Sequence, residues 1–153
     1  GIYRVVPYLL DQSDADQLNV LASAGPFNII IDDCCHNWAT QIQAFERLWP
    51  SVMPGGLYVI EHVVTSYKRH MDRVQVPGNK AHLLYPPYNA NSTISCVEYF
   101  KTLIDHINFD GADWDYADPT DLQRTIDTIT FRTNAIVVKK RMTANDPGIE
   151  KTE

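Results

Sequence analysis

The sequence predicts an α/β fold, a parallel sheet that finishes in an antiparallel hairpin. Two short apolar runs, 27–31 and 57–60, have the nearly continuous hydrophobicity of strands buried on both faces of a parallel sheet. An amphipathic segment over 38–49 separates them, and such a strand-helix-strand unit makes a right-handed crossover. Near the C-terminus, β-rich runs over 126–132 and 135–140 flank a Thr-Asn turn, which predicts the hairpin.

The other elements are separated by turn and breaker residues. A strand early in the chain contains a proline, which lacks a backbone donor and suits an edge position. The helices are expected to start at Asp or Ser capping residues. The expected elements are a strand over 2–10, a helix over about 14–24, a turn at 54–56, a long loop over 64–93, a helix from Ser95 to about Asn108, and a frayed tail after Arg141.

Composition narrows the classes of function. The chain has 153 residues, 44% hydrophobic and 21% charged, which suits one compact domain with its own core. Its net charge of -6 argues against nucleic acid or an anionic membrane surface as the main partner, because both require clustered Lys and Arg. No apolar run approaches the roughly 20 residues of a membrane span. We expect a soluble protein whose partner is a small molecule or another protein.

The three cysteines, Cys34, Cys35 and Cys96, show no CxxC spacing. Neither a disulfide framework nor a structural zinc site is therefore expected. They are interpreted as reduced thiols, which favours a reducing intracellular compartment.

Polar side chains that can bind a metal or transfer a proton follow both predicted parallel strands. The run Asp32-Asp33-Cys34-Cys35-His36 follows the first strand, and Glu61-His62 follows the second. In open α/β sheets, ligands bind outside the carboxyl ends of the strands. If the strands are neighbours, roughly 4.8 Å apart, Asp33 and Glu61 reach one divalent ion while His36 stays free on its loop. A carboxylate pair beside a free imidazole suits metal-assisted deprotonation of a hydroxyl.

Each of these residues also has an ordinary structural interpretation. An Asp-Asp pair after a strand is often a turn or a helix cap. A lone His36 or Glu61 is more often a solvated surface residue. Only their combination at two strand ends favours a functional site.

The motifs occur in an order that resembles a known family. They are the run 27–36, then Gln41, Phe45, Leu48, Pro50, the run 54–61 and Thr65-Ser66-Tyr67. This series resembles the macrolide-sugar O-methyltransferases of the mycinamicin and tylosin type, with their IDDGSH, PGGxYxIED and TSY motifs. These enzymes are class I S-adenosylmethionine-dependent methyltransferases. The likeness continues through 11–14, 97–105 and 136–140, and spans most of residues 9 to 141.

The resemblance implies a Rossmann-like class I methyltransferase sheet, with strand order 3-2-1-4-5-7-6. It implies that strands 3 to 7 are present, that the cofactor-binding strands 1 and 2 are absent, and that the C-terminal strands form the antiparallel hairpin. Residues 1–141 would be a partial methyltransferase-like domain and 142–153 a flexible tail. The strand over 27–31 would then have an unpaired apolar edge, which a missing N-terminal segment or another chain would cover.

The resemblance also implies roles for site residues. His36 would be the general base; Asp33, Glu61 and His62 would bind the metal; Asp11, Gln12 and Asp32 would bind S-adenosylmethionine. Magnesium is the ion that the family implies. His62, however, stands where the family has a ligand Asp, and imidazole suits zinc or the later transition metals better than magnesium. The metal therefore differs, or the site is weakened or lost. Cys34-Cys35 replaces a slim Gly-Ser pair beside the cofactor cleft.

Three functions remain open at this stage. The first is an O-methyltransferase that transfers a methyl group to a hydroxyl of a small molecule, such as a sugar or natural product, with metal assistance. The second is a catalytically inactive methyltransferase-like structural subunit of a larger assembly. The third is a small redox or metal-binding module built on Cys34, Cys35 and His36.

Overall fold

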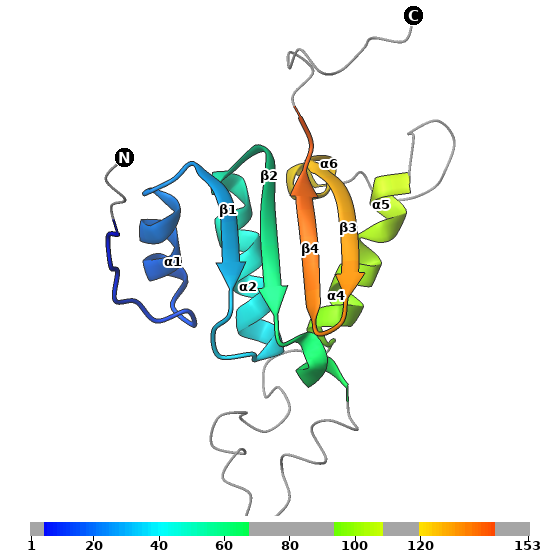
Figure 1. The fold of residues 1–153 in the computed structure, drawn as a ribbon, viewed down its shortest axis with the longest axis horizontal. Coiled ribbons are helices and arrows are strands. Elements are labelled where there is room, and N and C mark those ends of the chain that lie inside the picture. The colour runs from blue at the N-terminus through cyan, green and yellow to red at the C-terminus, as the bar shows by residue number, and fades with distance from the viewer. Residues whose placement is uncertain (1–4, 68–93, 109–119, 143–153) are drawn as a thin grey trace, which may run out of the picture.

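The computed structural model describes residues 5–67, 94–108 and 120–142, and these residues contain a mixed four-stranded sheet (Figure 1). The sheet order is β1-β2-β4-β3. β1 and β2 are parallel, whereas β4 runs antiparallel to both β2 and β3. The strands are β1 (Phe27–Asp32), β2 (Val52–Glu61), β3 (Ile126–Arg132) and β4 (Ala135–Lys140). The predicted parallel pair and C-terminal hairpin are confirmed.

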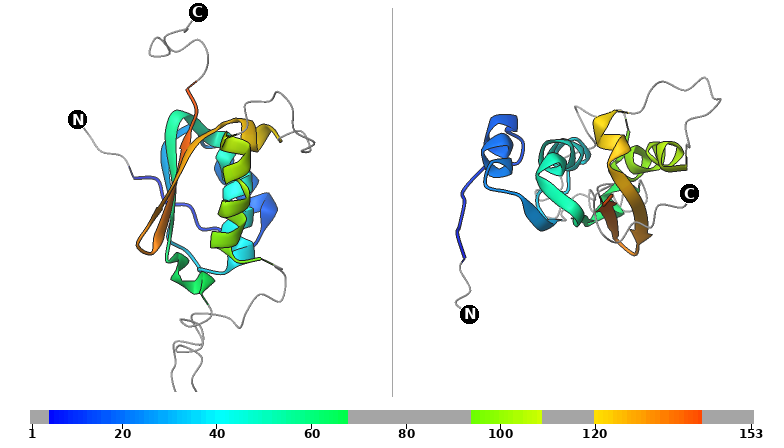
Figure 2. Two further views of the ribbon diagram at one scale, coloured as in Figure 1. Left: turned by 90° about the vertical axis from the view of Figure 1, so that its right-hand side faces the viewer. Right: turned by 90° about the horizontal axis from the view of Figure 1, so that it is seen from above.

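The helices that the structure describes lie on one side of this sheet, as Figure 2 shows. Four of them start at a side-chain cap: the side chains of Asp14, Asn37, Ser95 and Thr120 accept hydrogen bonds from amides of the following turn. The helices are α1 (Ala15–Ala22), α2 (Trp38–Leu48), α4 (Cys96–Thr102), α5 (Ile104–Asn108) and α6 (Asp121–Arg124), with short 3-10 helices η1 (Trp49–Ser51) and η2 (Val63–Ser66). None of the helices in the described ranges has the length and apolar character to cross a membrane.

The core lies between the helical layer and the sheet, and Phe45 of α2 is one of its fully buried residues. Phe45 is fully buried, and its ring centroid lies 5.2 Å from that of Trp49, 5.2 Å from that of Tyr58 and 4.8 Å from that of Phe100. Tilted and edge-to-face contacts at these separations are favourable geometries for aromatic pairs. One ring therefore joins α2, β2 and α4, which fixes the helices against the strand that leads into the site.

The opposite face of the sheet carries an apolar band that no described element covers. Ile29 and Ile31 of β1 are 56% and 63% exposed, and they are paired in register with Leu57 and Val59 of β2. Side chains alternate between the two faces of a strand, so these four residues share the face opposite the helices. We call them the outer apolar band. The expectation that β1 is buried on both faces is therefore wrong for the part of the chain that the structure describes.

The strand predicted over 2–10 is also wrong for residues 5–10, which contain no strand; residues 1–4 lie outside the described residues. Val5 and Leu9 are exposed there, and Leu9 fully so. A strand needs a hydrogen-bonded neighbour, and this segment pairs with none of the four described strands. Of the strands 3 to 7 implied by the resemblance, the described residues contain four.

Smaller differences concern boundaries. The turn predicted at 54–56 lies inside β2. The pairing of β1 with β2 is irregular there, because Phe27 pairs with Val52 and Ile29 with Leu57, and Gly55 takes a φ of 76°. This is an irregular, bulged stretch of strand that glycine accommodates. The helix predicted from Ser95 to Asn108 is divided at Leu103 into α4 and α5. Most of the predicted loop over 64–93 and of the tail over 142–153 lies outside the described residues.

The position of Phe45 leads to a stability prediction. Replacing it with alanine removes a fully buried ring from a close-packed cluster, and we expect the free energy of unfolding to fall by about 3–5 kcal/mol. Urea denaturation followed by circular dichroism measures the change. The matched control is Val20→Ala in α1, where the side chain is 65% exposed and the expected change is within about 0.5 kcal/mol. Equal effects for the two variants would contradict this description of the core.

Candidate functional site

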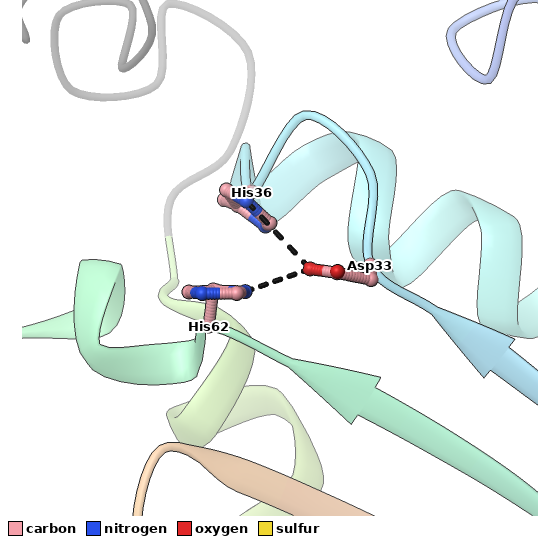
Figure 3. Close-up of side chains that lie close together, drawn as sticks. All are labelled: Asp33, His36 and His62. Carbon is pink, nitrogen blue, oxygen red and sulfur yellow. Dashed lines mark hydrogen bonds and ion pairs between the residues drawn. The ribbon is translucent and has the colours of Figure 1, made fainter.

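Parallel pairing of β1 and β2 brings their carboxyl ends together, with Asp32 opposite Ile60. The residues that follow form a compact cluster, which Figure 3 shows: Asp33 after β1, His36 on the loop into α2, and His62 after β2. The Nδ1 atom of His62 lies 2.7 Å from Oδ1 of Asp33, and Nε2 of His36 lies 3.9 Å from the same oxygen. One potential ligand atom from each residue lies within 4.8 Å of the others. We call this group the strand-end cluster.

Both histidines of the cluster have left-handed backbones, with φ of 55° at His36 and 57° at His62. Such a conformation is uncommon for a residue with a Cβ, although histidine adopts it more readily than most. Its cost is on the order of 1–3 kcal/mol for each residue, and it persists only where the surroundings hold it. The two imidazole rings are thereby brought to a centroid separation of 4.3 Å.

Thr65 is the residue that joins the two histidine turns. Its side chain is buried, and its hydroxyl lies 3.1 Å from the carbonyl oxygen of His36 and 3.2 Å from that of His62. Its own carbonyl accepts a hydrogen bond of 3.0 Å from Nε1 of Trp38. The next turn is tied to the hairpin, because Asn134 accepts a 2.9 Å bond from the amide of Val64. Hydrogen bonds to the backbone of both turns therefore fix the positions of the two histidines.

The environment of His36 keeps it neutral near neutral pH. Burial lowers the pKa of its imidazole, and the neighbouring His62 lowers it further, while Asp33 and Glu61 oppose this shift. A neutral imidazole offers a lone pair, either to a proton or to a metal ion. Asp33 remains half exposed, so the cluster is open to solvent on one side.

Glu61 stands apart from the cluster within the described part of the chain. The group of mutually close ligand atoms contains Asp33, His36 and His62 and does not include Glu61. The backbone carbonyl of Glu61 accepts a 3.1 Å hydrogen bond from the buried side chain of Gln41, which anchors the end of β2 to α2. The structure thus brings together two of the three predicted metal ligands and adds the predicted base; the ligand role of Glu61 stays a prediction.

A second polar group adjoins the cluster at the end of β1. Asp32 is buried, and its carboxylate accepts a 2.7 Å bond from Nε2 of Gln12 and a 3.4 Å bond from the hydroxyl of Tyr58. Burial raises the pKa of Asp32, and these hydrogen bonds partly offset the effect. Two of the predicted donor-binding residues, Gln12 and Asp32, therefore meet. The third, Asp11, accepts hydrogen bonds from the backbone amide and hydroxyl of Ser13 in its own turn.

Gln12 and Asp32 form the polar end of an elongated apolar groove along β1. A cavity of about 320 Å³ lies between the segment before α1 and the strand, with Leu10, Leu18 and Ile30 in its walls. A further cavity of about 180 Å³ continues it and shares Leu21, Ile30 and Leu48. Small-molecule sites are about 300–1,000 Å³, mostly apolar, with few polar groups. The larger cavity has this size and this mostly apolar lining, with Gln12 and Asp32 among its polar groups.

The three cysteines differ in their exposure to solvent. Cys34, Cys35 and Cys96 are free thiols in the structure. Burial raises the pKa of Cys34, and it raises that of Cys96 to about 12. A thiol with a raised pKa is a poor nucleophile and a poor metal ligand at neutral pH. The raised pKa values disfavour a reactive role for Cys34 and Cys96.

Several residues that shape the site were not assigned a role from the sequence. In the sequence, Thr65 is part of the Thr-Ser-Tyr motif, Asn134 is part of a hairpin turn, and Gln41 is part of the resemblance to the family. The polar side chain of Gln41 on the inner face of α2 was the one available signal, since a buried amide requires partners.

Comparison with solved structures defines the class of protein. The fold matches that of the MycE methyltransferase of the mycinamycin biosynthetic pathway, solved in complex with Mg, SAH and mycinamycin VI, with a TM-score of 0.66 and 28% sequence identity. The match covers 90% of this chain and 32% of that chain. The α/β sheet described above is therefore a methyltransferase fold.

Comparison with curated proteins narrows the class further. The chain is 34% identical over 155 residues to 8-demethyl-8-alpha-L-rhamnosyl tetracenomycin-C 2'-O-methyltransferase of Streptomyces olivaceus, which covers 97% of this chain. It is 50% identical over 58 residues to mycinamicin VI 2''-O-methyltransferase of Micromonospora griseorubida, over 37% of this chain. No protein-family model matches. The resemblance seen in the sequence is confirmed: the homologues of this chain are sugar O-methyltransferases of natural-product pathways.

The chain spans about a third of the length of the tetracenomycin 2'-O-methyltransferase that it matches, 36% of that sequence. This partial coverage is consistent with the expected correspondence to a C-terminal half. The activity of the whole protein is therefore a matter for proposal.

The role of Thr65 can be tested directly. Thr65→Val keeps the shape of the side chain and removes the donor shared by the carbonyls of His36 and His62. We expect a loss of about 1–3 kcal/mol in unfolding free energy, together with shifted imidazole NMR signals of both histidines. Thr128→Val, on the exposed side of β3, is the control and should change neither. Unchanged imidazole signals in Thr65→Val would show that Thr65 does not position them.

Proposed function

We propose that this chain forms part of an S-adenosylmethionine-dependent O-methyltransferase that methylates a hydroxyl of a sugar or natural product with the help of a divalent metal ion. The single observation that carries the proposal is the strand-end cluster lying beside the Gln12–Asp32 pair, in a chain homologous to sugar O-methyltransferases. Asp32 of the pair and Asp33 of the cluster are consecutive residues at the end of β1. An activated hydroxyl and a methyl donor would thus meet at one strand end.

The chemistry divides between the two groups. When bound, S-adenosylmethionine supplies an electrophilic methyl group, and the divalent ion lowers the pKa of the acceptor hydroxyl. Methyl transfer to the hydroxyl would release S-adenosylhomocysteine, and the hydroxyl proton would pass to a base. Asp33 and His62 would bind the ion. The predicted division, with Glu61 as a third ligand and His36 as the base that accepts the proton, stays a prediction.

The donor would bind at the polar end of the groove. Gln12 and Asp32 supply hydrogen-bonding groups there, and Asp11 lies one residue away in the chain. The apolar walls of the larger cavity suit a heteroaromatic ring. Cys34, in the position of a slim glycine of the family motif, lines the same cavity and narrows it. This geometry supports partial enclosure of the donor by the residues of this chain.

We also propose that a further segment of the same polypeptide completes the sheet at β1. The observed order β1-β2-β4-β3 corresponds to 4-5-7-6 in the family order, in which strand 1 is the next neighbour of strand 4. β1 has a free edge, and the groove beside it and the outer apolar band are exposed apolar surfaces. In folded proteins such edges and surfaces are usually covered by further strands, helices or partners. Residues 1–141 would then be one part of a larger methyltransferase domain.

A second function, that of an inactive structural subunit, is favoured by the same uncovered surfaces if another chain covers them. Donor binding separates the two candidates, because an inactive subunit has no need to bind the donor. Donor binding is therefore more informative than turnover for this choice.

Donor binding is the first test. The natural polypeptide, extended upstream of residue 1, should bind S-adenosylhomocysteine in calorimetry, whereas residues 1–153 alone should bind it at least about tenfold more weakly. Asp32→Ala in the extended protein should also weaken binding by about tenfold or more, because it removes the partner of Gln12. Asp127→Asn, which lies on β3, is the control. Absence of binding in the extended protein would favour the structural subunit.

The second test concerns the covering segment. Ile31→Lys places a charge on the outer apolar band, where the side chain is 63% exposed in this chain. It should leave the stability of residues 1–153 within about 0.5 kcal/mol of the parent. In the extended polypeptide, where the band would be buried, it should cost about 2 kcal/mol or more. Equal, small effects in both proteins would mean that the same polypeptide does not cover this face.

A further inference from the structure

We propose that Asp33, His36 and His62 are together the protein ligands of a zinc-class transition ion, so that His36 is a metal ligand and not the general base. The inference deepens the proposed function, since it concerns the metal of the same site. It departs from the ligand set that the family motif implies, because it includes His36 and leaves out Glu61.

The geometry of the cluster fits one small ion. A tetrahedral zinc site with bonds of roughly 2.0–2.1 Å separates its ligand atoms by about 3.4 Å. The two separations from Oδ1 of Asp33, 2.7 Å to His62 and 3.9 Å to His36, fall on either side of that value. The three ligand atoms lie within 4.8 Å of one another. Sub-ångström side-chain movements would therefore bring them into register around an ion.

The chemistry of the donors selects among metals. Two of the three donors are imidazole nitrogens and one is a carboxylate oxygen. Magnesium requires nearly octahedral oxygen coordination and is held through carboxylates, so a set with two nitrogens does not fit it. Zinc, cobalt and nickel accept imidazole readily. The substitution of His62 for the family's aspartate thus changes the class of ion and does not merely weaken a magnesium site.

The number of ligands is that of a catalytic zinc site and not of a structural one. Catalytic zinc sites have three protein ligands and keep one position open for water or substrate, whereas structural sites use four. Asp33 is 52% exposed and His62 is 39% exposed, so solvent reaches the cluster from the Asp33 side. An acceptor hydroxyl would occupy that open position.

The two histidines are preorganised for this role. Each has a left-handed backbone, and the buried Thr65 hydroxyl approaches both of their carbonyl oxygens. The arrangement links two turns that are far apart in sequence and directs both rings towards Asp33 (Figure 3). Ligands held in fixed positions need little rearrangement when an ion binds.

Metal titration tests the proposal without reference to turnover. Co²⁺ added to the metal-free chain should give the visible absorption bands of a low-symmetry, nitrogen- and oxygen-ligated site. Zn²⁺ should displace it stoichiometrically, and a large excess of Mg²⁺ should not. Displacement of Co²⁺ by Mg²⁺ as effective as that by Zn²⁺ would overturn the proposal.

Variants identify the ligands. His36→Ala should weaken Zn²⁺ binding by at least about tenfold, since losing a ligand costs no less than losing an outer-shell partner. His62→Asp should weaken Zn²⁺ binding and make Mg²⁺ an effective competitor. Asp127→Asn is the matched control, because it neutralises another partly exposed, ion-paired aspartate. Circular dichroism verifies that each variant is folded. Unchanged Zn²⁺ affinity in folded His36→Ala would restore His36 to the role of base.

Two further measurements distinguish other outcomes. The double variant Cys34→Ser, Cys35→Ser should retain Zn²⁺ affinity and the Co²⁺ bands; loss of binding, or sulfur-to-cobalt charge-transfer bands in the parent, would assign the ion to the thiols instead. Donor binding in the extended protein is measured separately. Zn²⁺ binding without donor binding would refute the proposed function and leave the metal site intact, and the reverse result would refute only the metal site.

Discussion

The parallel pairing of β1 with β2 is the constraint on which the rest of this site depends. Parallel strands end at the same edge of a sheet, and the register that sets Asp32 opposite Ile60 brings the two following turns side by side. A change of one residue in that register would send every side chain of a strand to the opposite face. Phe45 of α2 packs against Tyr58 of β2 and Phe100 of α4, so the core fixes β2, the strand that leads to His62, against the helices.

Much of this arrangement could be predicted from the sequence. The apolar runs, the intervening helix and the C-terminal hairpin have strong local signals, and the polar residues after each strand indicated the site. Local signals could not show that residues 5–10 lack a strand, because strand formation depends on a neighbour elsewhere in the chain. They also could not show that β2 begins at Val52, since the glycines that suggested a turn lie within a bulged strand.

The composition of the cluster was less predictable than its location. Asp33 and His62 were expected to meet, but the relative positions of Glu61 and His36 depend on side-chain directions after each strand. Those directions follow from left-handed residues and from the hydroxyl of Thr65, which carry no distinctive pattern in sequence. The inclusion of His36 and the separation of Glu61 are therefore structural findings.

The tip of the C-terminal hairpin reverses the chain and also holds the segment that follows His62. Asn134 takes a φ of 59° there, and its side chain and backbone oxygens accept hydrogen bonds from the amides of Val64 and Val63. The segment carrying His62 is thus clamped by residues about seventy positions further along the chain. Binding of an ion at the strand-end cluster would alter hydrogen exchange at the amides of Val63 and Val64. The occupancy of the cluster would thus affect the contact between this segment and the C-terminal hairpin.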